Sequence, residues 1–581
     1  MHGQRERGWR LDTAAGAASA ALALGVAELA AAVVPGARSL VVAVAVAVID
    51  GAPAGIVHLA IDLLGQNDKP VLAAGIVTVA LAAGAGLGAV GSTRPRLAAA
   101  GFAAFALLGA LAAGRDPAVS ALAAVAVAVT GAVAGIACLR RLLRIRPRPA
   151  DGGPVPPVGP GPAREPAATP AVEAAAVGAA TGTTAEATAG GAGAGTTAEA
   201  TPGGEGAGAT MEAAARGAGA DAAERAPTRR AFLAVTGSVV AVAAASAATG
   251  RLLDSRARDG ARAGVALLRP ARPAPVASGP TSFDVPGLVS PFVTPNDRFY
   301  RIDTALFPPS TDLGRWRLRI TGMVDHPYEL SYAELSALPM VEEYVTLVCV
   351  SNEVGDRLVG NALWRGVLLA DVLRRAGPRP DATQLVGRAI DGFTTGFPTE
   401  AALDGRNAMI AVGMNGVPLP GAHGFPARLI VPGLYGYVSA CKWLQEIELT
   451  RFEHFDAYWV RRGWARRAPV KTQSRIDTPN PSRPPRAGRV PIAGVAWAPH
   501  RGLSKVEVQV DGGAWAEARL ADGFRDTWRQ WLYEWEAARG RHTIRVRATD
   551  GEGQTQTPAV APPIPDGATG WHTVQVNVRP A

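Results

Sequence analysis

The sequence predicts a multi-domain protein: an N-terminal α-helical membrane domain, then a mixed α+β domain, then a C-terminal immunoglobulin-like β-sandwich. The first observation is that residues 13 to about 138 are almost free of charge. The second is a stretch rich in Pro, Gly, Ala and Thr that follows them. The third is that residues from about 281 onward have an ordinary globular composition with strand-like alternation. A chain of 581 residues is long enough for about three or four domains.

The N-terminal domain is expected over residues 1–148 and should contain about five membrane-spanning helices. A helix needs roughly 20 apolar residues to cross a bilayer. Stretches of about that length lie near 14–34, 40–64, 70–91, 97–114 and 118–139. Any one of them alone could be a core helix of a soluble protein, but five in succession favour a membrane domain.

The orientation of this domain is predicted from its loops, because Lys and Arg are enriched on the cytoplasmic side. With five spans, the count of Lys and Arg favours an external N-terminus and a cytoplasmic residue 140. A four-span version is the alternative. The second apolar stretch also contains Asp50, His58 and Asp62, for which a proton- or quinone-related role and simple placement near the ends of the span both stay open. A single histidine argues against a bis-histidine haem in this domain.

Two segments connect the membrane domain to the rest of the chain. Residues 149–227 contain a repeated Gly-Thr-Thr-Ala-Glu-Ala-Thr motif and too few large apolar residues to form a core, so they are expected to be a disordered linker. Residues 228–252 place Arg229 and Arg230 before an apolar run. This pattern is typical of a twin-arginine export signal that also forms a membrane helix, and it requires the two arginines to start in the cytoplasm.

Charge and cysteine content exclude some classes of function. The formal net charge is +9, but the basic residues are scattered and no nucleic-acid recognition motif accompanies them. Arginines that flank membrane helices explain the charge better. The three cysteines, Cys138, Cys349 and Cys441, are too few for a disulfide framework.

The soluble half shows two patterns. Strand-like runs at 315–321, 343–349 and 427–431 alternate with short helical pieces such as 366–376, which predicts a mixed α+β domain over 281–475. From about 490 the pattern is all-β. Residues 503–510 alternate, end in an Asp-Gly-Gly turn and are followed by a second strand at 542–548, which predicts an immunoglobulin-like sandwich over 480–581.

Cys349 is the first candidate for chemistry, because it ends a strand and enters a polar turn where a thiolate can act as ligand or nucleophile. Spaced motifs surround it in the sequence, namely 296–303, His423-Gly-Phe-Pro-Ala-Arg428, 431–433 and Lys442-Trp443. Together they resemble the sulfite oxidase family of molybdopterin enzymes, over about residues 285–581. The resemblance implies a molybdenum-molybdopterin cofactor, an α+β cofactor domain and an immunoglobulin-like dimerisation domain.

The resemblance also implies roles for individual residues. Cys349 would be the protein thiolate bound to molybdenum, and Arg301 would face the substrate as a catalytic residue. The positions implied to bind the cofactor are Asn296, Asp303, Asn352, His423, Arg428 and Lys442. Arg428 and Lys442 have an independent rationale, because a phosphate dianion requires fixed cationic donors. Cys441 is expected to pack near the site without binding metal.

Two departures from the family pattern bear on the substrate. Glu353 and Val354 stand where sulfite oxidases have arginines after the cysteine, and Phe393 stands where they bring a tyrosine to the metal. A carboxylate in place of cations weakens a site for a small dianion. The expected function is therefore two-electron oxygen-atom transfer on a small molecule other than sulfite. The alternatives are an S- or N-oxide reductase on the same scaffold and a metal-free membrane-tethered binding module.

The expected electron partner depends on a haem-attachment motif. The chain has no haem-attachment Cys-x-x-Cys-His motif. Electrons would therefore pass to a separate carrier or to a quinone in the membrane. The protein is expected to lie in the cell membrane with its catalytic domain on the extracytoplasmic side, to form a homodimer through its last domain, and to bind no nucleic acid.

Overall fold

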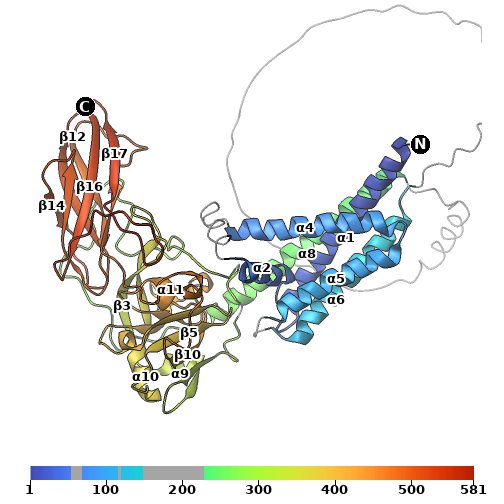
Figure 1. Ribbon diagram of the computed structural model, residues 1–581, viewed down its shortest axis with the longest axis horizontal. Helices are drawn as coiled ribbons and strands as arrows, with labels where there is room; N and C mark the ends of the chain where they lie inside the picture. The colour runs from blue at the N-terminus through green and yellow to red at the C-terminus, as the bar shows by residue number, and fades with distance from the viewer. Residues whose placement is uncertain are drawn as a thin grey trace, which may run out of the picture.

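A computed structural model describes residues 2–53, 56, 68–115, 119–147, 228–305, 307–309 and 311–581. A helical bundle from the N-terminal half and a β-rich body from the C-terminal half lie at opposite ends of the molecule (Figure 1). The linker predicted over 149–227 lies outside the described residues, as do His58 and Asp62.

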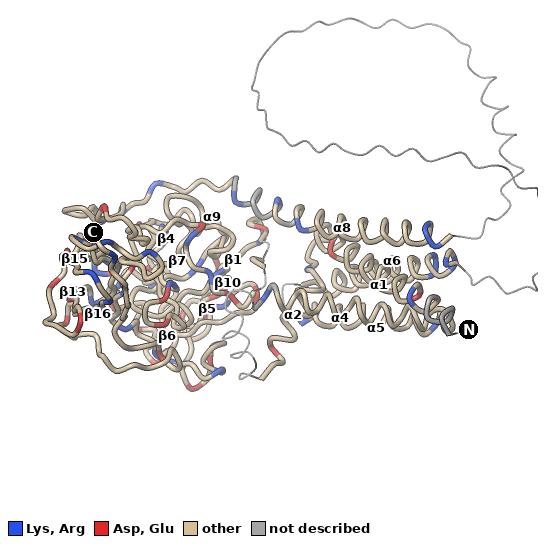
Figure 2. Tube along the Cα trace, turned by 90° about the horizontal axis from the view of Figure 1, so that it is seen from above, with Lys and Arg blue, Asp and Glu red and all other residues tan. Residues whose placement is uncertain are grey.

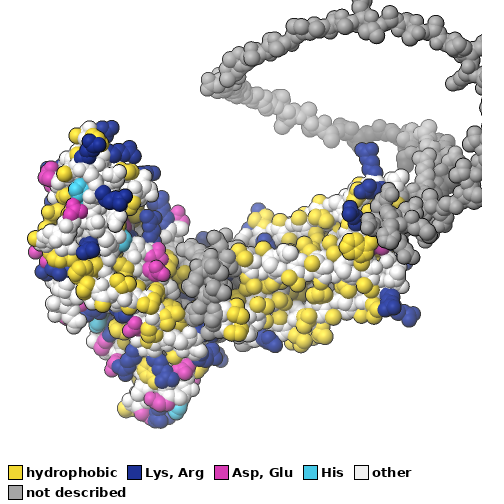
Figure 3. All heavy atoms as spheres, turned by 45° about the horizontal axis from the view of Figure 1, so that its top comes forward, with side chains coloured by type: hydrophobic (Ala, Val, Ile, Leu, Met, Phe, Trp, Pro, Cys, Tyr) yellow, Lys and Arg dark blue, Asp and Glu magenta, His cyan; other side chains and the backbone are white. Residues whose placement is uncertain are grey.

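Six helices form the bundle in the described part of the chain. They are α1 (His2–Val33), α2 (Leu40–Gly51), α4 (Asp68–Gly91), α5 (Pro95–Ala113), α6 (Ala121–Arg144) and α8 (Arg229–Ala263). All except α2 contain a segment long and apolar enough to cross a membrane. The outer surface of the bundle is largely hydrophobic, whereas apolar and charged side chains are mixed on the β-rich body (Figure 3).

The second apolar stretch does not form the helix expected over 40–64. Helix α2 ends at Gly51, and Ala52 is extended, with φ −77° and ψ 138°. Pro53 follows, and a proline disfavours helical geometry in the residue before it. The 12 residues of α2 span roughly 18 Å, which is too short to cross a bilayer.

The two ends of the bundle can be identified from contacts between its helices. The carboxylate of Asp12, near the start of α1, pairs with Arg146 just after α6, at 2.5 Å. The end of α4 lies at the same place, because an added Cβ on Gly88 would come within 2.1 Å of the Asp12 carbonyl oxygen. Helices α1, α4, α5 and α6 each contain a segment long and apolar enough to cross a membrane, and they run back and forth along the bundle. The N-terminus and residue 144 lie at the same end of the bundle, not at opposite ends as predicted for five spans.

Small residues allow the helices to approach α1 closely. An added Cβ on Gly16 would lie 2.1 Å from the carbonyl oxygen of Gly84 on α4, and one on Gly25 would lie 2.3 Å from that of Ala243 on α8. Further along, Gly250 of α8 packs against the backbone of Glu28. The residue numbers of the contacting pairs increase together along the two helices, from Gly25 with Ala243 to Glu28 with Gly250. Helices α1 and α8 are therefore parallel. Close backbone contact through small residues is typical of helix packing in membranes.

The mixed domain contains two five-stranded sheets. The first has the order β2 (Tyr328–Ser331), β1 (Arg317–Gly322), β10 (Leu444–Thr450), β5 (Gln384–Ala389), β6 (Thr394–Pro398). The second has the order β3 (Met340–Val348), β4 (Val359–Leu368), β7 (Met409–Met414), β8 (Val417–Pro418), with β9 (Arg428–Ile430) also pairing with β7. Ile320, Leu385, Ile410 and Leu429 are fully buried in one core that both sheets share. Helices α9 (Tyr332–Ala337) and α10 (Leu369–Ala376) also contribute to it.

The last part of the chain is a seven-stranded antiparallel sheet. Its strand order is β11 (Gln473–Thr478), β12 (Gly488–Trp497), β15 (Arg529–Ala537), β14 (Ala516–Leu520), β13 (Leu503–Val510), β16 (Gly540–Asp550), β17 (Thr573–Val578). Ile492, Trp531, Val506 and Ile544, from both halves of this order, share one core, so the sheet folds over onto itself. The predicted all-β character is confirmed.

The two β-rich parts are joined by buried contacts. Trp528 donates its indole N–H to the Phe292 carbonyl oxygen at 2.9 Å and its backbone N–H to the Thr346 hydroxyl at 2.7 Å. Trp528 and Trp497 belong to the core of the mixed domain. The last sheet therefore supports strand β3, which ends at Val348, directly before Cys349.

Candidate functional site

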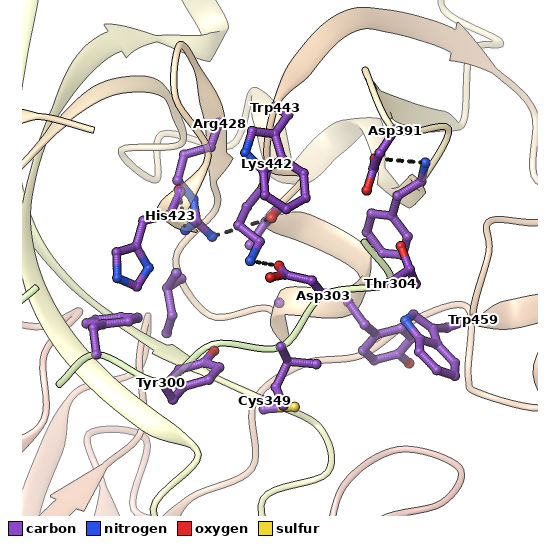
Figure 4. A pocket seen from close by; sticks show the side chains of 17 residues that line it. Tyr300, Asp303, Thr304, Cys349, Asp391, His423, Arg428, Lys442, Trp443 and Trp459 are labelled. Carbon is purple, nitrogen blue, oxygen red and sulfur yellow. Dashed lines mark hydrogen bonds and ion pairs between the residues drawn. The ribbon is translucent and has the colours of Figure 1, made fainter. Parts of the chain in front are cut away.

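One pocket in the mixed domain collects most of the residues singled out in the sequence. Loops and strand ends of both sheets form its wall (Figure 4). It is lined by Phe299, Tyr300, Ile302, Asp303, Thr304, Leu347, Cys349, Asp391, Phe393, His423, Arg428, Gly436, Tyr437, Ala440, Lys442, Trp443 and Trp459.

Cys349 is placed by the end of strand β3. Its backbone N–H donates to the Leu358 carbonyl oxygen at 2.9 Å, and its carbonyl oxygen accepts from Asn352 at 3.1 Å, which closes a turn. The turn leaves the thiol on the pocket wall (Figure 4). Burial raises the pKa of this thiol, and hydrogen bonds from Ser351 act in the opposite direction. A bound metal cation would reverse this effect, because a coordinating thiol is deprotonated.

His423 is a neutral side chain with a defined tautomer. Its Nε2 lies 2.8 Å from the Asn296 carbonyl oxygen, so Nε2 carries the proton and Nδ1 is the acceptor. Burial lowers the pKa of His423 to about 4, with Arg428 and Arg301 adding to the effect. Phe299 packs edge-on against the imidazole, with ring centroids 5.6 Å apart. The hydrogen bond from Nε2 and the contact with Phe299 together fix the position of the imidazole ring.

Arg428 is a buried cation in the pocket wall. One guanidinium N–H donates to the His423 carbonyl oxygen at 3.0 Å, and another approaches the Ala440 carbonyl oxygen at 3.4 Å. The guanidinium also lies over the Trp364 ring, 5.0 Å from its centroid. Burial lowers the pKa of Arg428 to about 10, which leaves it charged at neutral pH. The buried Nε has no hydrogen-bond partner among the described residues.

Asp303 and Lys442 form an ion pair at the pocket (Figure 4). The Asp303 side chain is fully buried, and its other oxygen accepts from Arg301 Nε at 2.5 Å. Lys442 Nζ also approaches the Ala422 carbonyl oxygen at 3.3 Å. Burial lowers the pKa of Lys442, and the charges of Arg301 and Lys69 lower it further. The adjacent Asp303 carboxylate opposes that shift, because an opposite charge favours the ionised form.

Gly424 allows Arg428 and Lys442 to reach the same pocket. It follows the short 3₁₀ turn Gly421–His423 and has φ +111°, a backbone conformation that side chains disfavour. A Cβ at this position would lie 3.1 Å from the Cβ atoms of both Arg428 and Lys442. The two cations converge because this residue has no side chain.

The structure brings together five of the eight residues predicted for the site. Those on the pocket wall are Cys349, Asp303, His423, Arg428 and Lys442. Asn296, Arg301 and Asn352 do not line it. Arg301 is exposed and forms an ion pair with Asp303.

Asn296 and Asn352 hold backbone segments near the pocket. Asn296 Oδ1 accepts from the Asn415 amide at 2.7 Å. Asn352 Oδ1 accepts from the Leu358 backbone N–H at 2.8 Å and so stabilises the turn after Cys349. Both side chains therefore position residues that themselves face the pocket or adjoin it.

Several residues of the pocket wall were not predicted from the sequence. They are Tyr300, Asp391, Tyr437, Trp443 and Trp459. Tyr300 and Trp443 lie inside the motifs recognised by resemblance, and Asp391 adjoins the segment compared for Phe393. Nothing in the sequence marked Tyr437 or Trp459, which come to the pocket from segments that lack a recognised motif.

The wall chemistry fits a phosphate-bearing molybdopterin. A soft thiolate is a suitable ligand for molybdenum. The Arg428 guanidinium has an N–H without a partner among the described residues, as a buried donor awaiting an anion would. The cations at one end of the pocket and the thiol at another match a ligand with an anionic part and a metal.

Comparison with known proteins agrees with this reading of the pocket. Residues 305–459 match the oxidoreductase molybdopterin binding domain. The uncharacterized oxidoreductase YuiH of Bacillus subtilis is 34% identical over 181 residues, which are 31% of this chain and 88% of that protein. The mitochondrial sulfite oxidase of Macaca fascicularis is 29% identical over 349 residues, which are 50% of this chain and 63% of that protein.

A solved structure is also similar. It is that of the sulfane dehydrogenase SoxCD from Paracoccus pantotrophus, which is 23% identical, has a TM-score of 0.44, and covers 50% of this chain and 85% of its own. The fold and the matched domain together define a molybdopterin-binding oxidoreductase. The chain belongs to the sulfite oxidase family, and its cofactor is molybdenum-molybdopterin.

Proposed function

We propose that this protein is a membrane-anchored oxidoreductase that transfers an oxygen atom to or from a small molecule other than sulfite. The observation that supports this is the division of charge in the pocket. Among the described wall residues, the cations are Arg428 and Lys442, and both are suited to the phosphate of the pterin. Phe393, Tyr437 and Trp459 form an aromatic part of the wall, which suits an uncharged substrate better than a dianion.

In this proposal each wall residue has a separate task. Cys349 provides the thiolate ligand, and the cofactor supplies two-electron oxygen-atom transfer. Arg428 and Lys442 bind the phosphate, with Asp303 orienting Lys442. Neutral His423 offers Nδ1 as an acceptor to the pterin. Asn296 and Asn352 hold the backbone around the site, and Arg301 acts through Asp303.

A second candidate is the reductive direction on the same scaffold, with an S- or N-oxide as substrate. The aromatic wall favours it, because an organic oxide has an apolar body that can pack against Phe393 and Trp459. Assays of the purified protein with an electron-accepting dye and with a reduced dye distinguish the two directions. Turnover of sulfite at a rate equal to that of the best organic substrate would contradict the proposed selectivity.

The cofactor assignment has its own experiment. Molybdenum and pterin should be present in the purified wild-type protein. Cys349→Ser should keep the pterin and lose turnover, because it removes the metal ligand but leaves the phosphate contacts intact. Full activity in this variant would exclude Cys349 as the ligand. A wild-type protein without molybdenum or pterin would favour the metal-free membrane-tethered binding module.

The distribution of arginines supports one orientation in the membrane. Basic residues gather at the end of the bundle that holds the N-terminus, away from the β-rich body (Figure 2). The positive-inside rule then puts this end in the cytoplasm and the catalytic half on the other side. The described residues at this end include Arg10, Arg94, Arg96, Arg140, Arg141, Arg144, Arg146, Arg229 and Arg230.

This orientation agrees with a twin-arginine export signal, since Arg229 and Arg230 begin α8 at the cytoplasmic end. The glycine contacts between α8 and α1 support a signal that stays in place as a membrane helix and is not cleaved. Replacing Arg229 and Arg230 with Lys should keep the catalytic half in the cytoplasm. Protease added outside spheroplasts measures this outcome. It digests a catalytic half that has been exported and leaves intact one that stays in the cytoplasm.

The remaining organisation is also proposed. Residues 1–148 and 228–252 form the membrane part, with residues 149–227 as its linker, and residues 281–475 form the cofactor domain. The sheet over 480–581 is proposed to be immunoglobulin-like and to pair two subunits. Electrons would be exchanged with a separate carrier or with a quinone in the membrane.

A further inference from the structure

We propose that the helical bundle completes the cofactor pocket by supplying Lys69 as a positioning residue for the Asp303–Lys442 pair. This inference rests on the proposed function, because it assigns a task to the membrane part within the same site. It differs from a simple anchor, in which the bundle would hold the enzyme at the membrane without affecting the pocket.

The first observation is a direct contact between the two parts of the molecule. Lys69, in the first turn of α4, donates a hydrogen bond from Nζ to the backbone carbonyl oxygen of Asp303. Asp303 lies on the pocket wall, and its carboxylate pairs with Lys442. Asp303 therefore links the two lysines, because its carbonyl oxygen accepts from Lys69 and its carboxylate pairs with Lys442.

The second observation is the charge around Asp303. Arg301 and Lys442 pair with the fully buried Asp303 carboxylate, and Lys69 donates to the backbone carbonyl oxygen of the same residue. Three cations therefore gather around Asp303 at this part of the pocket. The field of Lys69 reaches Lys442, because it contributes to lowering the pKa of that group. Such a concentration of positive charge favours an anionic ligand, and the phosphate of the pterin has the required charge.

A second bridge lies at another part of the pocket wall. Asp50, in the last turn of α2, lies 3.7 Å from the Arg462 guanidinium. Arg462 stacks on Tyr458 at 3.6 Å, and Tyr458 contacts Trp459 of the wall edge-on. The Asp50 side chain is 56% exposed, so this pair contributes little energy by itself. It does show that α2 and α4 both approach the pocket, as the tube in Figure 2 also indicates.

The experiment compares full-length variants in detergent. Lys69→Met removes the charge and the donor, whereas Lys69→Arg keeps both. Arg115→Met is the matched control, because Arg115 is an exposed cation at the same end of the bundle and shows no ion pair among the described residues. Pterin and molybdenum per chain are measured after prolonged dialysis, together with turnover per chain.

Lys69→Met should lose pterin about tenfold faster than the wild type, as expected when a charged donor is removed from a buried site. Turnover per chain should fall together with the pterin content, and Lys69→Arg should restore retention. The inference is overturned if Lys69→Met retains pterin like the wild type. It is also overturned if Arg115→Met loses pterin equally, since the cause would then be the total charge of the bundle. Absence of pterin from the wild type would instead refute the proposed function.

Discussion

The turn at Gly424 offers the sharpest test of how the pocket is built. Gly424→Ala adds one methyl group where φ is +111° and where the Cβ atoms of Arg428 and Lys442 would lie 3.1 Å away. The backbone conformation alone costs an alanine about 1–3 kcal/mol. Crowding adds about 1–3 kcal/mol, because neither neighbour's Cβ can move without shifting its backbone.

Gly416→Ala separates these two effects. Gly416 also has a positive φ, +80°, but a Cβ there would meet no atom within 4 Å. It lies in the turn between β7 and β8, outside the pocket wall. Gly416→Ala should therefore show the conformational cost alone, whereas Gly424→Ala should show both costs and displace the two cations.

The assay measures the melting temperature and the pterin content of each full-length variant. A loss of 1 kcal/mol lowers the melting temperature of a domain of this size by about 2–4 °C. Gly424→Ala should melt at a lower temperature than Gly416→Ala and should alone lose pterin. Equal melting temperatures, with full pterin content in both variants, would refute the reasoning.

Three further predictions concern other contacts. Arg428→Lys keeps the charge but loses the planar donor fork, so pterin bound per chain should fall about tenfold while the chain still folds. Gly88→Leu should destabilise the bundle in detergent, because its Cβ would lie 2.1 Å from a carbonyl oxygen of α1, whereas Gly86→Leu, with open space, should not. Burial lowers the pKa of His572 to about 4, and its Nδ1 accepts from the Ile476 backbone N–H. The folded protein therefore binds fewer protons than the unfolded chain between about pH 6.5 and pH 4, so its melting temperature should fall as the pH decreases through this window, and His572→Gln should reduce that slope.

The comparison of α2 with the other apolar helices shows where sequence reasoning is weakest in the membrane part. Length and hydropathy identified the apolar stretches, because crossing a bilayer places a direct demand on composition. They did not show that α2 ends before Pro53, and the number of crossings decides on which side every later loop lies. With α2 shortened by this helix break, the N-terminus and residue 144 lie at the same end of the bundle.

In the pocket, too, some residues could be predicted from the sequence and others could not. The sequence motifs predicted that Cys349, His423, Arg428 and Lys442 would meet at one site, and all four line the pocket. Arg301 was expected to face the substrate, yet it pairs with Asp303. Tyr437 and Trp459 were not expected at all. The direction of a side chain and the meeting of distant segments depend on packing, which the order of residues along one segment does not reveal.

The sequence by itself determined the class of each part of this protein: apolar helices, an α+β domain and an all-β end. These properties follow from composition and periodicity, which act locally along the chain. The tertiary structure alone decided that α2 ends at Gly51 and that Asp303 joins Arg301 to Lys442. It also decided that Lys69 reaches the pocket from the bundle. Residues 69 and 303 are far apart in sequence, and only the packing of α4 against the catalytic half brings them into contact.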